Sequence, residues 1–210
     1  MSLVFTGDEF RDGLPHIAQV LKKKKVKAAF FVTGKFLEDK KSARILVDLY
    51  RDGHYVGPHS DKHLLYAPWE KRDSLLVTKE EFVQDLEANV AKLQKLGIDR
   101  GSMFIPPYEW YNRQTVEWAE ELNFSVYNYT PGLRTPADYT YPEMANRYMS
   151  SDAILNQLYS YEETNGLNGY IILIHIGTDP RRTDKLYLRL EELIDKLNAK
   201  NYNFVRLEKL

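Results

Sequence analysis

Two histidines four residues apart are the strongest chemical signal in this sequence. His59 and His63 enclose the segment HSDKH, and on a helical turn this spacing places both imidazoles on one face. Neutral imidazole binds zinc, cobalt and nickel well, and Asp8, at the end of the first apolar run, would add a carboxylate ligand. The pattern predicts a metal site formed by these three residues. The alternative is a chance spacing in which both rings only pack or cap.

Other reactive side chains follow other apolar runs. Tyr108 and Glu109 come directly after the proline pair that stops one run, and His175 ends the run GYIILIH. Three of the five histidines therefore lie at the ends of predicted strands. In a parallel α/β barrel the active site lies at the carboxyl ends of the strands, so we expect these groups to meet in one cleft.

The elements that must position these groups alternate regularly along the chain. The predicted strands cover residues 3–6, 26–33, 53–57, 102–105, 124–129, 169–175 and 203–207, and the predicted helices cover 14–25, 43–52, 79–96, 115–122, 153–161 and 185–200. Thr78 and Glu81 form a capping box at the start of the third helix. Strands that are apolar on both faces and alternate with helices are typical of a parallel sheet covered by helices. We expect an α/β fold, a distorted (β/α) barrel with about seven parallel strands; a doubly wound sheet is the alternative.

The composition narrows the class of protein. The chain has 210 residues, no cysteine and a net charge of −1, which predicts one domain over residues 1–210. A near-zero charge argues against nucleic-acid partners, and no apolar run is long enough for a membrane-spanning helix. No signal peptide is visible, and Met1 leads straight into a strand, as in a domain excised from a longer protein. The oligomeric state is not predicted.

Four motifs in order give the chain a family resemblance. It resembles the polysaccharide deacetylases, carbohydrate esterases that share the chitooligosaccharide-deacetylase homology domain, a distorted (β/α) barrel. Their first motif, Thr-Phe-Asp-Asp-Gly followed by a strand such as VKATFFVTG, is matched here by VFTGDEF and VKAAFFVTG. Their His-Ser/Thr-x-x-His is matched by HSDKH, their Arg-x-Pro-Tyr by IPPY at residues 105–108, and their Leu-x-His by LIH at residues 173–175.

The resemblance implies a metal-dependent hydrolase that removes acetyl groups from a carbohydrate. Asp8, His59 and His63 fall on the family's metal ligands, with zinc the expected ion and cobalt or nickel as alternatives. The metal would bind water and the acyl oxygen and lower the pKa of the water. The backbone N–H of Tyr108 would hold the oxyanion. His175 would protonate the leaving group.

The chain also departs from the family pattern. The first Asp of the first motif, the family's catalytic base, falls on Gly7, and the Arg that orients that base falls on Ile105. The Asp that tunes the catalytic histidine has no match in residues 126–140. We expect Glu109 to replace the missing base, although a solvated loop carboxylate is the alternative, and Asp179 to pair with His175.

The resemblance and the residue types also predict substrate contacts. Leu173 would line the acetyl-methyl pocket, Trp110 and Tyr111 would stack on sugar rings, and Arg134 would hold a hydroxyl or carboxylate.

Three hypotheses about function remain. The first hypothesis is a deacetylase that acts on a non-peptide C–N bond or an acetyl ester, with activity reduced by the loss of the base. The second is a degenerate relative that binds carbohydrate without turnover. The third is an amidase on a non-sugar bond. The resemblance points to an extracytoplasmic location.

Overall fold

Six parallel strands surround the centre of the protein in the computed structural model, which describes all 210 residues. One sheet has the order β3-β2-β1-β6 and the other pairs β4 with β5. The strands are β1 (Ser2–Gly7), β2 (Ala29–Val32), β3 (Tyr55–Pro58), β4 (Met103–Phe104), β5 (Ser125–Val126) and β6 (Ile171–His175). The predicted α/β class with parallel strands is confirmed.

The second sheet lies beside β3 at one edge, and the chain that follows β5 lies beside β6 at the other, which gives a distorted barrel. The Tyr55 hydroxyl on β3 accepts from the Met103 N–H at 2.9 Å and donates to the Met103 carbonyl at 2.8 Å. At the other edge, the Thr130 N–H donates to the Ile171 carbonyl at 3.1 Å, and its hydroxyl accepts from the Ile171 N–H at 3.0 Å. The side chains of Tyr55 and Thr130 thus supplement the backbone bonds where the ring of strands is interrupted.

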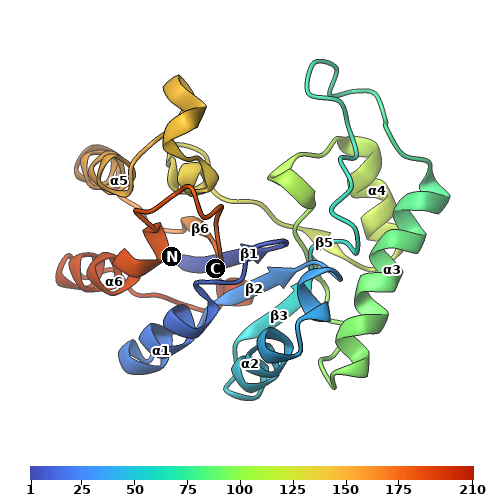
Figure 1. The fold of residues 1–210 in the computed structure, drawn as a ribbon, viewed down its shortest axis with the longest axis horizontal. Coiled ribbons are helices and arrows are strands. Elements are labelled where there is room, and N and C mark those ends of the chain that lie inside the picture. The colour runs from blue at the N-terminus through green and yellow to red at the C-terminus, as the bar shows by residue number, and fades with distance from the viewer.

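The strand predicted at residues 203–207 is wrong. This segment lies beside Met1, whose ammonium group donates to the Asn203 carbonyl at 3.1 Å and whose carbonyl accepts from the Val205 N–H at 2.9 Å. Because β1 begins at Ser2, only one residue is available there for pairing, and the chain turns into the 3₁₀ helix η6 (Leu207–Lys209). The two chain ends therefore lie close together (Figure 1).

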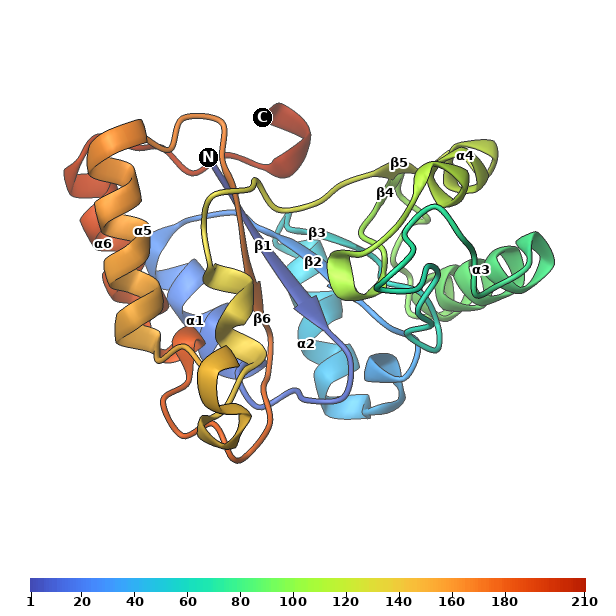
Figure 2. The same ribbon diagram turned by 90° about the horizontal axis from the view of Figure 1, so that it is seen from above.

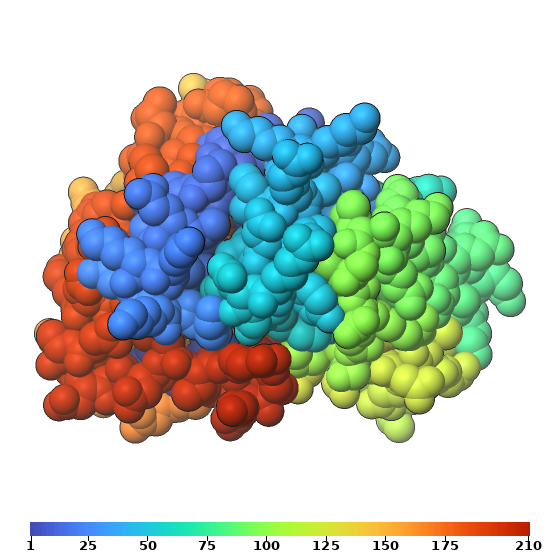
Figure 3. Space-filling view, turned by 90° about the horizontal axis from the view of Figure 1, so that it is seen from below, coloured from blue at the N-terminus to red at the C-terminus, as the bar shows by residue number.

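Six α-helices lie outside the strands (Figures 1 and 2). They are α1 (Leu14–Lys24), α2 (Lys40–Arg51), α3 (Lys79–Lys95), α4 (Arg113–Glu121), α5 (Ser151–Asn165) and α6 (Leu190–Ala199). Figure 3 shows α1, α2 and α3, coloured blue, cyan and green, side by side on one face. The predicted capping box of α3 is formed, with Thr78 and Glu81 each accepting the other's backbone N–H. None of the helices has the length and apolar character needed to cross a membrane.

Side chains alternate between two apolar layers along each central strand. Leu3 and Phe5 of β1 belong to the layer between the sheet and the helices, whereas Val4 packs inside the barrel with Phe31 and Leu173. Both layers are fully buried at these positions. This alternation fixes which residues reach the carboxyl end of the barrel: on β1, even-numbered side chains face inward and odd-numbered ones face the helices.

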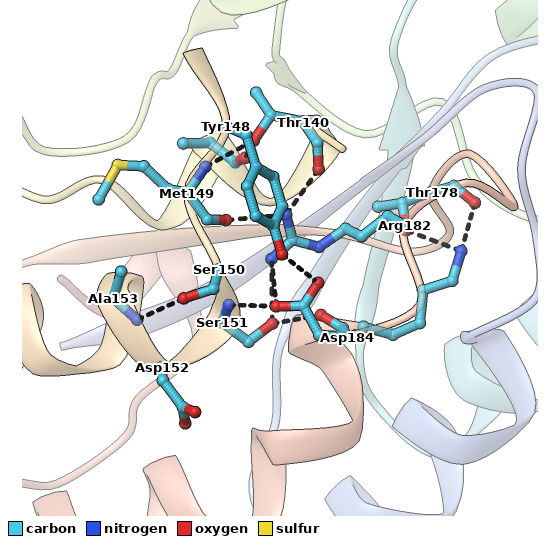
Figure 4. A network of polar contacts seen from close by, with 12 residues as sticks. Thr140, Tyr148, Met149, Ser150, Ser151, Asp152, Ala153, Thr178, Arg182 and Asp184 are labelled. Atoms are coloured by element: carbon cyan, nitrogen blue, oxygen red, sulfur yellow. Dashed lines mark hydrogen bonds and ion pairs between the residues drawn. The ribbon is translucent and has the colours of Figure 1, made fainter. Parts of the chain in front are cut away.

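A buried arginine joins the irregular segment before α5 to the loop that follows β6 (Figure 4). Arg182 has no solvent exposure. Its Nη1 donates to the carbonyls of Thr140 at 2.6 Å and Met149 at 2.9 Å, and its Nη2 donates to the Ser151 hydroxyl at 3.0 Å. The Asp184 carboxylate lies 3.6 Å from Nη2 and balances the charge. The guanidinium thus holds residues 140–151 against the loop that follows β6, two segments that are not joined by a helix or a sheet.

Replacement of this arginine should destabilise the fold. Arg182→Lys keeps the charge but cannot reach three acceptors with a planar fork, and we expect the free energy of unfolding in urea to fall by roughly 2–4 kcal/mol. Arg181→Lys is the control, because Arg181 is exposed, pairs with Asp179 and lies over the Tyr141 ring at the surface; this variant should lose at most about 1 kcal/mol. Equal losses in the two variants would contradict the assignment.

Candidate active site

The polar side chains at the strand ends meet in one cleft, as predicted. The cleft has a volume of about 830 Å³ and lies at the carboxyl ends of β1, β3 and β6. Its lining includes Asp8, His59, His63, Tyr108, Glu109 and His175. Residues that are more than one hundred positions apart in the sequence are thus brought together by the parallel arrangement of the strands.

The two histidines of the HSDKH segment lie side by side, with ring centroids 5.0 Å apart. The Nδ1 of His59 lies 2.7 Å from the Ile105 carbonyl, and a carbonyl only accepts, so Nδ1 carries the proton and Nε2 is left with its lone pair. The Nδ1 of His63 lies 3.9 Å from a carboxylate oxygen of Asp8. The hydroxyl of Thr33, at the end of β2, donates to the other Asp8 oxygen at 2.9 Å.

The segment is not the helical turn that the spacing suggested. Ser60 and His63 have φ values of 70° and 57°, in the left-handed region. Two buried polar residues of α3 hold this conformation: Asp85 accepts from the N–H groups of residues 61 and 62 at 3.1 and 3.0 Å, and the side-chain oxygen of Asn89 accepts from the His59 N–H at 3.0 Å. The third helix therefore positions both imidazoles through backbone contacts.

Asp8, His59 and His63 are suitable ligand types for a divalent metal, but their side-chain atoms do not converge on a single position. Burial lowers the pKa of His59 to about 3 and that of His63 to about 4, so both rings are neutral at pH 7, the form that binds metal. Two neutral imidazoles and the Asp8 carboxylate are ligands that zinc, cobalt and nickel accept. As the side chains stand, no three histidine, cysteine or acidic residues form a group that could hold a metal ion.

Glu109 lies in the cleft opposite the histidines. One of its carboxylate oxygens is 4.0 Å from the Nε2 of His59, and its side chain is only 10% exposed. Burial raises its pKa to about 7. Tyr108 and Glu109 have φ values of 60° and 54°, and two successive left-handed residues that are not glycine are a strained conformation of the kind found at functional sites. The strain directs the carboxylate into the cleft rather than into solvent.

His175 is paired with Asp138, not with the predicted Asp179. Its Nδ1 lies 2.5 Å from one Asp138 oxygen, and its backbone N–H donates to the other at 2.9 Å. Burial disfavours the imidazolium, but the charge and hydrogen bond of Asp138 outweigh it, and the pKa of His175 rises to about 9. Asp179 pairs instead with Arg181 at the surface. Asp138 lies in η3 (Thr135–Tyr139), inside the stretch in which no motif was recognised.

The structure also changes which residue of β1 faces the cleft beside Asp8. A Cβ on Gly7 would lie 2.7 Å from Phe36 and 2.8 Å from Ile176, in the layer under the helices. A side chain at residue 7 would therefore point away from the cleft. Thr6 faces the cleft instead, and its hydroxyl is buried without a hydrogen-bond partner. Gly7 still lines the cleft, and a side chain at this position would require Phe36 and Ile176 to shift.

The predicted substrate-binding residues lie outside the cleft lining. Leu173 is buried in the barrel interior below it. Trp110 packs behind the cleft wall against the Arg72 guanidinium, 4.4 Å from its ring centroid, and Tyr111 lines a separate surface hollow. Arg134 lies beside α5, where its N–H donates to Gln157. Trp69 and Arg147, which the sequence did not single out, line the cleft together with Tyr139 and Tyr141.

Comparisons with known proteins agree with this architecture. The family model described as polysaccharide deacetylase matches residues 2–127. A peptidoglycan-N-acetylglucosamine deacetylase of Bacillus cereus is 25% identical over 207 residues, which are 99% of this chain and 66% of that protein. The chain spans slightly less than two thirds of the length of the curated relatives it matches.

Two solved structures share the fold. A peptidoglycan N-acetylglucosamine deacetylase in complex with a hydroxamate-type benzamide superposes with a TM-score of 0.76 at 24% identity, over 99% of this chain and 86% of that one. A family 4 carbohydrate esterase pseudoenzyme from Bacillus anthracis superposes with a TM-score of 0.75 at 19% identity, over 100% of this chain and 64% of that one. These similarities establish the arrangement of strands and helices.

The pair of His175 and Asp138 should make stability depend on pH. The folded pKa of His175, about 9, is above its ordinary value, so the pair's contribution is complete below about pH 6.5 and is lost as the pH rises through about 9. Asp138→Asn should therefore lower the free energy of unfolding by roughly 2–3 kcal/mol near pH 6 and by much less near pH 10.

The free energies of unfolding are measured in urea with a chelator present, so that bound metal does not contribute to the difference between pH 6 and pH 10. Asp73→Asn is the matched control, because Asp73 is an exposed loop carboxylate and its replacement should change stability little at either pH. A loss in Asp138→Asn that is the same at both pH values would show that the ion pair is not formed.

Proposed function

The chain belongs to the polysaccharide deacetylase family, and from that premise we propose that it is a metal-dependent hydrolase that removes acetyl groups from a carbohydrate. The observation that carries the proposal is the single cleft in which a buried carboxylate, Glu109, and an aspartate-paired imidazole, His175, accompany Asp8, His59 and His63. A base, an acid and a set of metal ligands in one cleft are what hydrolysis of an acetamide or acetyl ester requires.

Each residue has a role that follows from its surroundings. Asp8, His59 and His63 would hold the metal, which when bound would act as a Lewis acid on the acyl oxygen and on water. Glu109 takes the proton of the attacking water, and His175, protonated at neutral pH and held by Asp138, gives a proton to the leaving nitrogen or oxygen. The backbone N–H of Tyr108 donates to the oxyanion.

The relatives support a proposal for the substrate class. Because a matched protein is a peptidoglycan-N-acetylglucosamine deacetylase, we infer an N-acetylated glycan as substrate and a location outside the cytoplasm. The exposed rings of Tyr108 and Tyr139 beside His63 and His175 suit the apolar faces of sugar rings. Zinc is the proposed ion, with cobalt and nickel as alternatives that the same ligands accept.

The proposal predicts acetate release that needs an added metal. The purified protein should release acetate from chitooligosaccharides, from peptidoglycan or from acetylated xylan when zinc, cobalt or nickel is added, and a chelator should abolish the release. Coupled enzymatic detection of acetate measures the rate. Absence of acetate with all three metals and all three substrates would contradict the proposed reaction.

A second candidate function is carbohydrate binding without turnover. The positions at which the family pattern has a catalytic Asp and its orienting Arg are Gly7 and Ile105 in this chain, and they supply neither a carboxylate nor a guanidinium. A protein with the same fold is described as a pseudoenzyme, so the fold itself is compatible with either function. Sugar binding without acetate release would favour this candidate.

Glu109→Gln distinguishes a catalytic carboxylate from a structural one. The amide cannot accept a proton, so acetate release should fall by about 10²–10⁴-fold, while sugar binding measured by calorimetry stays close to that of the unchanged protein. Glu9→Gln is the matched control: Glu9 is an exposed carboxylate at the rim of the same cleft, and its replacement should cost little activity. Full activity in Glu109→Gln would exclude this residue as the base.

A further inference from the structure

A row of aromatic rings continues the wall of the cleft away from His175. The ring of Tyr108 lies 4.3 Å from that of His63, and the ring of Trp69 lies 5.6 Å from that of Tyr108 at an interplanar angle of 82°. Trp69 lines the same cleft as His175, yet 52% of its surface is exposed. An exposed tryptophan in the cleft that also contains His63 and His175 is a candidate contact for a ligand.

The orientation of Trp69 is fixed from behind. Trp110 lies 5.5 Å from it, ring to ring, and the Arg72 guanidinium covers Trp110 at 4.4 Å. The Nε of Arg72 donates to the Tyr111 carbonyl at 2.6 Å, which anchors the guanidinium in turn. A ring held in this way loses little conformational freedom when a ligand covers it, so its contact area contributes more fully to affinity.

We propose that Trp69 and Tyr108 form a subsite for a second sugar unit, so that the preferred ligand is an oligosaccharide that extends from the reacting sugar toward Trp69. The location of the reacting sugar beside His63 and His175 rests on the proposed function. Continuity with the cleft favours a sugar chain over another occupant, and the Glu70 carboxylate, which lines the cleft beside Trp69, accepts hydrogen bonds from sugar hydroxyls.

Binding of chitooligosaccharides of increasing length tests the subsite without turnover. Calorimetry on the full chain should show the tetramer binding roughly 3- to 10-fold more tightly than the monomer, a gain set by one added stacking contact. Trp69→Ala should remove most of that gain.

Tryptophan fluorescence gives a second measurement. The intrinsic fluorescence of the protein should change on titration with the tetramer, and Trp69→Phe should remove the change, because the other two tryptophans lie outside the cleft lining.

The control is Leu76→Ala, which removes an equally exposed apolar side chain from the same loop and should keep the difference between tetramer and monomer. The inference is overturned if Trp69→Ala keeps that difference, if the tetramer binds no better than the monomer, or if sedimentation shows that Trp69 instead holds two copies of the chain together. A protein that binds the tetramer through Trp69 but releases no acetate would overturn the proposed reaction and leave this subsite standing.

Discussion

Neighbouring side chains of a strand point to opposite faces, and this rule decides which residues of the barrel can take part in chemistry. On β6, Leu173 and His175 share the inner face, so an apolar layer supports the imidazole from below. On β1 the same rule turns Thr6 toward the cleft and Gly7 toward Phe36. A motif must therefore be matched in the correct register, because one step along a strand reverses the direction of the side chain.

The groups that tune the cleft come from outside the strands. Asp85 and Asn89 of α3 hold the backbone around His59, and Asp138 of η3 holds His175. All three are buried, so each is costly to leave without a partner. The strands supply the reactive atoms, whereas the helix and the 3₁₀ segment fix their orientation. A relative could keep every strand-end residue and still lose the geometry through a change in these supports.

Periodic features of the fold were predictable from the sequence, and features that depend on long-range contacts were not. The ranges of β1, α1 and α3, the capping box at Thr78 and the meeting of His59, His63 and His175 all follow from apolar patterning and from the position of strand ends. Asp138 could not be assigned because its partner lies 37 residues away and its segment has no periodicity. Trp69 could not be assigned either, because it lies in an irregular loop. The segment at residues 203–207 has the composition of a strand, but beyond the 3₁₀ turn that follows it its backbone bonds only to Met1, and no strand forms there.

The contacts of Arg182 also bear on how the molecule fluctuates. One guanidinium bonds Thr140, Met149 and Ser151 from the loop that follows β6, so neither segment can separate from the barrel without exposing groups of the other. Two stretches that would otherwise fray independently are joined into one cooperative unit. Their amide hydrogens should share one free energy of opening, and this shared opening would release Asp138 from His175. The orientation of His175 is thus held only while this unit stays closed.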